Sequence, residues 1–115
     1  MDESAYQHLA DAAFKRIDDA FRDVDPDVID CERAGDVIVF TLKGGKKFVL
    51  NTQRPTRQIW LAANSRAWHF GWDETAKRWF DDKGERNPDG TPLELFGALR
   101  KLVHDASGIE IELAA

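Results

Sequence analysis

Carboxylates are the side chains of this sequence that most clearly suggest chemistry, and they crowd into its first third. Asp18, Asp19 and Asp23 recur at the spacing of neighbours on a helix, and Asp30 and Glu32 fall two residues apart, on one face of a strand. Crowded like charges repel one another, and a multivalent cation relieves that repulsion. Oxygen ligands on an open surface select hard or borderline ions by charge, so the pattern is typical of a weak, labile cation site. A merely solvating acidic surface is the commoner meaning of such residues, and both interpretations stay open.

Tighter catalytic or metal motifs do not fit the sequence. The segment that begins at Asp23 opens like a calcium loop, but its sixth position is Val28 rather than Gly and its twelfth is Ala34 rather than Glu. No His has a second His or Cys at ligand spacing, so only His69 is retained, as an auxiliary metal ligand. The single Cys31 alternates onto the core face, where a small buried thiol is expected. No nucleophile with a base is recognisable locally, and we predict that the chain is not an enzyme.

A second candidate surface surrounds one tryptophan. If the sheet buries one face, alternation sends these apolar residues toward the core: Phe48, Leu50, Ile59, Leu61 and Phe70. The other face then carries Val49, Asn51, Gln53, Gln58, Trp60 and His69. A large aromatic residue among amides on an open sheet is either a binding residue or one that packs on its strand neighbours. The amides and the tryptophan are therefore candidate partner-binding residues: Asn51, Gln53, Gln58 and Trp60.

Two helices are expected to support these surfaces. Apolar residues at spacings of three and four predict a first helix, which Ser4 with Gln7 would begin as a capping box and which would end before Pro26. A second helix is expected to begin with Thr91 as its N-cap and to end at Ser107 and Gly108. The segment after it alternates apolar and acidic residues, as an extended tail does.

Between the helices the apolar period changes from three or four to two, which predicts strands. After a first run around Ile29 to Glu32, the runs cover residues 37–42, 47–53, 57–62, 67–72 and 78–81. Turn signals at Ala34-Gly35-Asp36 and at Gly44-Gly45 predict antiparallel hairpins. The order of elements predicts an α+β fold: a two-layer sandwich in which the N- and C-terminal helices pack on one face of an antiparallel sheet of about six strands.

Composition and charge limit the function classes. A chain of 115 residues with 43% hydrophobic and 32% charged residues is expected to form a single domain over residues 1–115. No apolar run is long enough to span a membrane and the N-terminus lacks a secretory signal, so we expect a cytoplasmic protein with no membrane partner. Residues 1–36 hold eleven acids and four bases, whereas residues 37–72 hold no acid. The charge is therefore predicted to be strongly asymmetric, which suits cations or a basic partner.

One run is specific enough to identify a family. The sequence Asn51-Thr52-Gln53-Arg54-Pro55-Thr56-Arg57-Gln58-Ile59-Trp60-Leu61-Ala62 resembles the central motif of frataxins. Leu9-Ala10-Asp11, Ile29-Asp30-Cys31-Glu32 and Trp68-His69-Phe70 resemble the bacterial, CyaY-type branch. The resemblance extends from about Tyr6 through the second predicted helix, in the family's order of elements.

The resemblance implies an iron-binding regulator of iron–sulfur cluster assembly. Such a protein binds ferrous and ferric iron weakly, docks on the cysteine desulfurase and modulates sulfur delivery to the scaffold protein. It is expected to be a monomer that can oligomerise with iron. The acidic positions that the family uses fall here on Asp11, Asp18, Asp19, Asp23, Asp25, Asp27, Asp30 and Glu32. Arg22 stands where bacterial relatives tend to carry an acid, and residues 73–77 and 85–89 form loops longer than is usual.

A nucleic-acid module is the alternative function. The acid-free stretch from Val37 to Trp72 would place bases together with Trp60 and His69 on one open sheet. An RNA-recognition sheet needs helices interleaved with its strands, whereas this sequence predicts consecutive strands. The net charge of −5 also opposes phosphate, so we expect no nucleic-acid partner.

Overall fold

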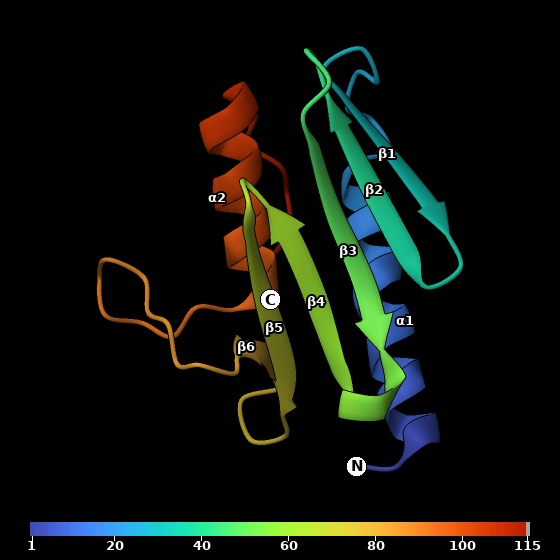
Figure 1. Ribbon diagram of the computed structural model, residues 1–115, viewed down its shortest axis with the longest axis vertical. Helices are drawn as coiled ribbons and strands as arrows, with labels where there is room; N and C mark the ends of the chain where they lie inside the picture. Colours follow the sequence, from blue (N-terminus) through green and yellow to red (C-terminus); the bar gives the residue numbers. More distant parts are fainter. Residues whose placement is uncertain (115) are drawn as a thin grey trace.

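The structure is a computed structural model, which describes residues 1–114. Two helices, α1 (Glu3–Ala20) and α2 (Leu95–Ser107), lie on the same face of one sheet (Figure 1). The sheet contains β1 (Ile29–Ala34), β2 (Val37–Leu42), β3 (Lys47–Gln53), β4 (Gln58–Ala63), β5 (Arg66–Asp73) and β6 (Arg78–Asp81). The predicted two-layer α+β architecture is confirmed.

All six strands pair with their neighbours in chain order, and every pair is antiparallel. Strand β1 therefore forms one edge of the sheet and β6 the other. Asn64 and Ser65 join β4 to β5, and both have positive φ angles, of 52° and 62°. That conformation matches the twist of a two-residue hairpin and keeps the two strands in tight register. The short 3-10 helix Arg54–Thr56 connects β3 to β4.

The core lies between the sheet and the helices, on the face that alternation predicts. The residues predicted to point inward are fully buried, with 0% exposure: Phe48, Leu50, Ile59, Leu61 and Phe70. Their strand neighbours on the other face are half-buried or exposed. Tyr6 and Phe14 of α1 and Leu95 and Leu99 of α2 fill the helical side of the same cluster. Within residues 1–114, neither helix is long and apolar enough to cross a membrane.

Helix α1 begins earlier than the sequence suggested. Its N-cap is Asp2, whose carboxylate accepts a hydrogen bond from Ala5 N at 2.7 Å, so the predicted capping box at Ser4 is wrong. The carboxylate two residues earlier is an equally good cap by residue type, and its use lengthens the helix by two residues. The helix ends at Ala20, which is before Pro26 as predicted, and Asp23 lies in the turn that follows it.

Helix α2 starts later than predicted. Its N-cap is Glu94, which accepts hydrogen bonds from Phe96 N at 2.9 Å and from Gly97 N at 2.5 Å. The predicted N-cap, Thr91, instead belongs to an extended segment in which Leu93 O accepts a hydrogen bond from Asp81 N at the edge of β6. Pairing with a free sheet edge satisfies backbone groups that an additional helical turn would have left to solvent. Gly108 ends the helix with a φ of 77°, as predicted.

The segment after α2 packs against the core in an extended form. Ile111 and Leu113 are buried, whereas Glu110 and Glu112 are exposed. Arg16 of α1 donates a hydrogen bond to Ala114 O, and Arg100 of α2 donates one to Leu113 O. The segment therefore lies between the two helices and is held by an arginine from each.

Candidate functional site

The eight predicted acidic residues, here called the acidic ridge, form one exposed strip at the β1 edge of the molecule. Helix α1 supplies Asp11, Asp18 and Asp19, the turn after it supplies Asp23, Asp25 and Asp27, and β1 supplies Asp30 and Glu32. All eight are exposed. The strip follows from topology, because α1 is connected directly to the edge strand β1 and packs beside it.

Only part of the acidic ridge is neutralised within residues 1–114. Asp19 pairs with Lys15 at 2.9 Å and with Arg22 at 2.5 Å, and the hydrogen bond from Lys15, with the charges of both bases, lowers its pKa. Asp11 lies 3.7 Å from Arg33. The other six carboxylates have no ion-pair partner among the described residues: Asp18, Asp23, Asp25, Asp27, Asp30 and Glu32. The unpaired negative charge is therefore concentrated where α1 meets β1.

Cys31 shows how closely the helix and strand carboxylates approach. Its thiol is half-buried on the core side of β1, and Asp18, Asp30 and Cys31 line one shallow pocket of about 200 Å³. Burial raises the pKa of Cys31 to about 12, and the charges of Asp18 and Asp30 add to that effect. A thiol with so high a pKa is not a nucleophile at neutral pH. The effect of both charges on its pKa shows instead that carboxylates from α1 and β1 lie near the same thiol.

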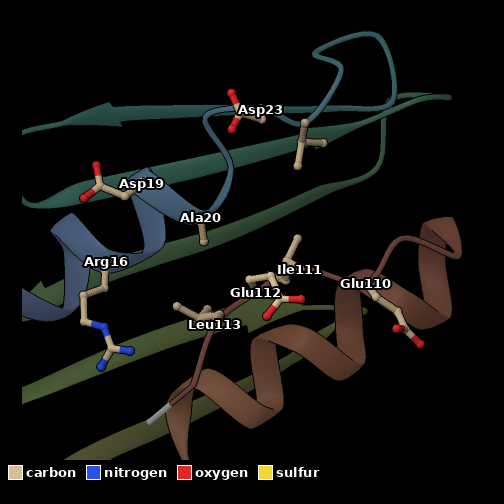
Figure 2. A pocket seen from close by; sticks show the side chains of 9 residues that line it. Arg16, Asp19, Ala20, Asp23, Glu110, Ile111, Glu112 and Leu113 are labelled. Carbon is tan, nitrogen blue, oxygen red and sulfur yellow. The ribbon is translucent and has the colours of Figure 1, made fainter.

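The structure adds two acids that the sequence analysis did not assign to this surface. Figure 2 shows a groove between the C-terminal part of α1 and the segment after α2, lined by Asp19 and Asp23 on one side and by Glu110 and Glu112 on the other. Its volume is about 520 Å³. Alternation predicted that the two glutamates would be exposed, but only the packing of the segment against α1 places them beside the acidic ridge.

The acidic ridge offers oxygen ligands without a tight cage. Within residues 1–114, no three His, Cys, Asp or Glu side chains converge closely enough to hold a metal ion. The chemistry open to this surface is loose, exchangeable binding of hard or borderline cations by carboxylates.

The second predicted site, here called the tryptophan face, lies on the side of the sheet that the helices leave uncovered. It comprises Asn51, Gln53, Gln58 and Trp60, all half-buried. Asn51 lies directly opposite Trp60 across β3 and β4, and Gln53 lies opposite Gln58. The indole of Trp60 donates a hydrogen bond to Gln58 Oε1 at 2.9 Å. The structure therefore brings all four residues together on adjacent strands.

Two further residues hold this face, and sequence reasoning missed one of them. His69 stacks on Trp60 with ring centroids 4.0 Å apart and an interplanar angle of 12°. Asp82, just beyond β6, accepts a hydrogen bond from Gln58 Nε2 at 3.0 Å. No local pattern marks Asp82, because its place on the face depends on the register between β5 and β6.

Tyr6 fixes the ends of the strands that carry the face. Its side chain is fully buried, and its hydroxyl donates to Gln58 O at 2.7 Å and accepts from Gln53 N at 3.1 Å. One phenol thereby joins the end of β3 to the start of β4 from the helical side of the sheet. The two glutamines of the tryptophan face are positioned by a residue of α1.

The basic residues of the acid-free stretch do not gather into a nucleic-acid surface. Lys43, Lys46 and Lys47 lie at the β2–β3 turn, whereas Arg54 and Arg57 lie at the opposite ends of the strands. Arg54 pairs with Asp36 at 3.3 Å, and Arg66 pairs with Glu85 at 2.8 Å. The bases are divided between two ends of the sheet, and two of them are partly neutralised.

Comparison with known proteins agrees with this architecture. The model of the frataxin-like domain matches residues 1–106. The iron–sulfur cluster assembly protein CyaY of Pseudomonas aeruginosa is 39% identical over 93 residues, which cover 81% of this chain and 84% of the relative. CyaY of Variovorax paradoxus is 34% identical over an alignment that covers 100% of this chain and 99% of the relative.

Solved structures share the fold. Frataxin from Psychromonas ingrahamii superimposes with a TM-score of 0.82 at 21% identity, and the match covers both chains completely. Trimeric yeast frataxin from Saccharomyces cerevisiae, in a complex with ferrous iron, gives a TM-score of 0.70 at 24% identity and covers 88% of this chain and 87% of the yeast chain. The match of the family model over most of the sequence, the identity to bacterial relatives and the shared fold show that this chain belongs to the frataxin family.

Proposed function

We propose that this protein is a non-enzymatic, iron-binding regulator of iron–sulfur cluster assembly, with cysteine desulfurase and the scaffold protein as its partners. Its relatives in Pseudomonas and Variovorax are iron–sulfur cluster assembly proteins, and the yeast relative was solved with ferrous iron. The observation that carries the proposal is the set of six carboxylates on the acidic ridge that have no ion-pair partner among the described residues. The tryptophan face adds a preorganised aromatic surface on β4 and β5.

Iron binding would occur on the acidic ridge, at the junction of α1 and β1. The six ridge carboxylates that are unpaired in the described part of the chain repel one another, and entry of a divalent or trivalent cation reduces that repulsion. Binding is expected to be weak and exchangeable because no three ligands converge on one point among the described residues. Iron also screens the charge that keeps copies apart, so we expect a monomer that associates when iron is in excess.

Amide NMR with La³⁺, a diamagnetic stand-in for ferric iron, tests the position of the metal. We expect residues 11–32 to shift first, and we expect Asp18→Asn with Asp30→Asn to weaken that shift. A matched control is Asp105→Asn with Glu74→Asn, which removes the same charge from residues outside the acidic ridge and should leave the titration unchanged. Shifts spread evenly over the sheet, or no shift at millimolar metal, would contradict this part of the proposal.

The two surfaces would act differently in docking. The acidic ridge provides long-range attraction to a basic surface of the desulfurase, and exposed charges mainly set the association rate and its salt dependence. The tryptophan face provides short-range contact with the desulfurase–scaffold complex, and a packed aromatic anchor mainly sets the dissociation rate.

Stopped-flow or surface-based kinetics with purified desulfurase separates these roles. Asp18→Lys with Asp30→Lys should slow association and flatten its dependence on salt, since neither carboxylate has an ion-pair partner within residues 1–114. Asp105→Lys with Glu74→Lys makes the same change in net charge elsewhere and is the control. If both double variants slow association equally, net charge rather than the acidic ridge attracts the partner.

A further inference from the structure

His69 and Asp82 lie side by side on the uncovered face of the sheet, at the edge opposite the acidic ridge. Asn51, Trp60, His69 and Asp82 form one row across β3, β4, β5 and the end of β6. The Nδ1 atom of His69 is 3.8 Å from Oδ2 of Asp82, which is too long for a hydrogen bond. Two ligand atoms of one tetrahedral ion, each bonded at about 2.1 Å, lie about 3.4 Å apart. The separation of His69 Nδ1 and Asp82 Oδ2 is close to that distance, so the two atoms could bind one ion after a small movement.

Both side chains are held in place before any ion arrives. Their exposed fractions are 31% for His69 and 34% for Asp82. The imidazole is fixed by its stack on Trp60, and the carboxylate by the hydrogen bond from Gln58 Nε2. Asp82 N also donates to His69 O at 2.8 Å, which locks the two backbones together. Partners that orient metal ligands in this way raise metal affinity.

From this geometry we propose that His69 and Asp82 form a half-site for a first-row divalent cation that prefers imidazole nitrogen, such as Zn²⁺, Co²⁺ or Cu²⁺. The two residues supply one nitrogen and one oxygen ligand, and water or a ligand from a docked partner completes the coordination. The ligand set differs from the carboxylates of the acidic ridge, so the half-site selects a softer class of ion. It does not depend on the proposed role in cluster assembly.

The chain carries its own control for this proposal. His104 Nδ1 lies 3.9 Å from Asp105 Oδ1, almost the same separation. Both side chains are more exposed, at 56% and 58%, and Lys101 Nζ lies 3.0 Å from the other oxygen of Asp105. A cation already pairs with that carboxylate, and neither ring nor carboxylate is stacked or buried. The His104–Asp105 pair should therefore bind metal less well than the His69–Asp82 pair.

NMR of the full chain provides the test, with Zn²⁺ as a diamagnetic and Co²⁺ as a paramagnetic probe. Zn²⁺ should shift the imidazole resonances of His69 before those of His8 and His104. Co²⁺ should broaden the indole cross-peak of Trp60 before those of the other three tryptophans, because Trp60 stacks on the ligand. Loss of an orienting partner usually costs about 10–100-fold in metal affinity, so loss of a ligand in His69→Asn is expected to weaken binding by at least about tenfold.

Three variants decide the outcome. Asp82→Asn should also weaken Zn²⁺ binding, whereas His104→Asn and the acidic-ridge variant Asp18→Asn with Asp30→Asn should leave it unchanged. Circular dichroism checks that each variant is folded, and Asp82→Asn serves as the ligand test if His69→Asn is not. Equal shifts of the three histidines, or a first shift at His104 or on the acidic ridge, would overturn the half-site whether or not the protein acts in cluster assembly.

Discussion

The indole of Trp60 and the imidazole of His69 lie parallel on β4 and β5, with their centroids 4.0 Å apart. The indole N–H is already donated to Gln58 and one ring face is covered by His69, so the group presents its other ring face rather than a free donor. Stacking and hydrogen bonding together reduce the side-chain entropy that docking would otherwise cost. An aromatic residue that is half-exposed yet fixed has the properties of a binding anchor.

Trp60→Arg should therefore weaken the desulfurase–scaffold complex while leaving the fold intact. We expect a loss of more than about 1 kcal/mol, which is about fivefold in Kd, because this is the usual threshold for a contact residue that matters. Trp68→Arg is the matched control: Trp68 faces the core at 8% exposure, and its replacement should unfold the protein. A folded Trp60→Arg protein with unchanged affinity would remove the tryptophan face from the interface.

Tyr6→Phe should lower the free energy of unfolding. The change removes one hydroxyl and leaves Gln58 O and Gln53 N without their partner at the ends of β4 and β3. An unsatisfied buried polar group costs about 1–3 kcal/mol, so urea denaturation should show a loss of that size. A loss within experimental error would mean that water replaces the hydroxyl.

Tyr6 should also make the fold sensitive to alkali. Burial is the main cause that raises the pKa of its hydroxyl above the usual 10.0. The unfolded chain then ionises first, so this contribution is complete below pH 10 and is lost as the pH rises through the folded pKa. We expect unfolding free energy above pH 10 to fall more steeply in the wild type than in Tyr6→Phe, measured by urea denaturation at each pH.

Most of the fold could be predicted from the sequence because its signals are local. Strand period, turn residues and the αL glycine at position 108 act over a few residues, and the predicted strand bounds lie within two residues of those in the structure. The two helix starts were predicted wrongly, since Asp2 and Ser4 are equally good caps by type and the residues before α2 pair with the edge of β6 instead. A competing tertiary partner is invisible in a local pattern.

The residues of the candidate sites were likewise predictable only where their signal is local or belongs to the family motif. The eight acids of the acidic ridge and the four residues of the tryptophan face could be named from residue type, alternation and family resemblance. Asp82 and the glutamates at positions 110 and 112 could not, because each reaches its surface through contacts with residues distant in the sequence. The ion pairs that neutralise Asp19 were not foreseen either, although Lys15 lies one helical turn before it and Arg22 three residues after it.

The rate at which Cys31 is alkylated should depend on the charges of Asp18 and Asp30, the acidic-ridge carboxylates that act on its thiol. The reactive species is the thiolate, and a pKa of about 12 keeps its population small at pH 8. We expect slow reaction with iodoacetamide, with a rate that keeps rising above pH 9 instead of levelling off. Asp18→Asn or Asp30→Asn removes a charge that raises the pKa of Cys31, so each should speed alkylation, as La³⁺ bound at these carboxylates should.

Asp105→Asn is the control for this measurement, because Asp105 is not among the charges that act on Cys31. Rates should be compared below the melting temperature, since unfolding exposes the thiol in any variant. Equal acceleration by Asp105→Asn would indicate a general effect of net charge. Unchanged rates in Asp18→Asn and Asp30→Asn would place the two carboxylates farther from the thiol than the structure does.

Neighbouring aspartates on α1 should have opposite effects on thermal stability. Asp18 has no ion-pair partner among the described residues and lies in a field of like charge, so Asp18→Asn should raise the melting temperature at low salt. Asp19 pairs with Lys15 and Arg22, which lower its pKa, and Asp19→Asn should lower the melting temperature. The contribution of Asp19 is present above its unfolded pKa and is lost as the pH falls through its lowered folded pKa. Calorimetry at low and high salt decides the matter, because screening should shrink both effects. A rise in both variants would show that repulsion along the acidic ridge outweighs the pairs that Asp19 makes.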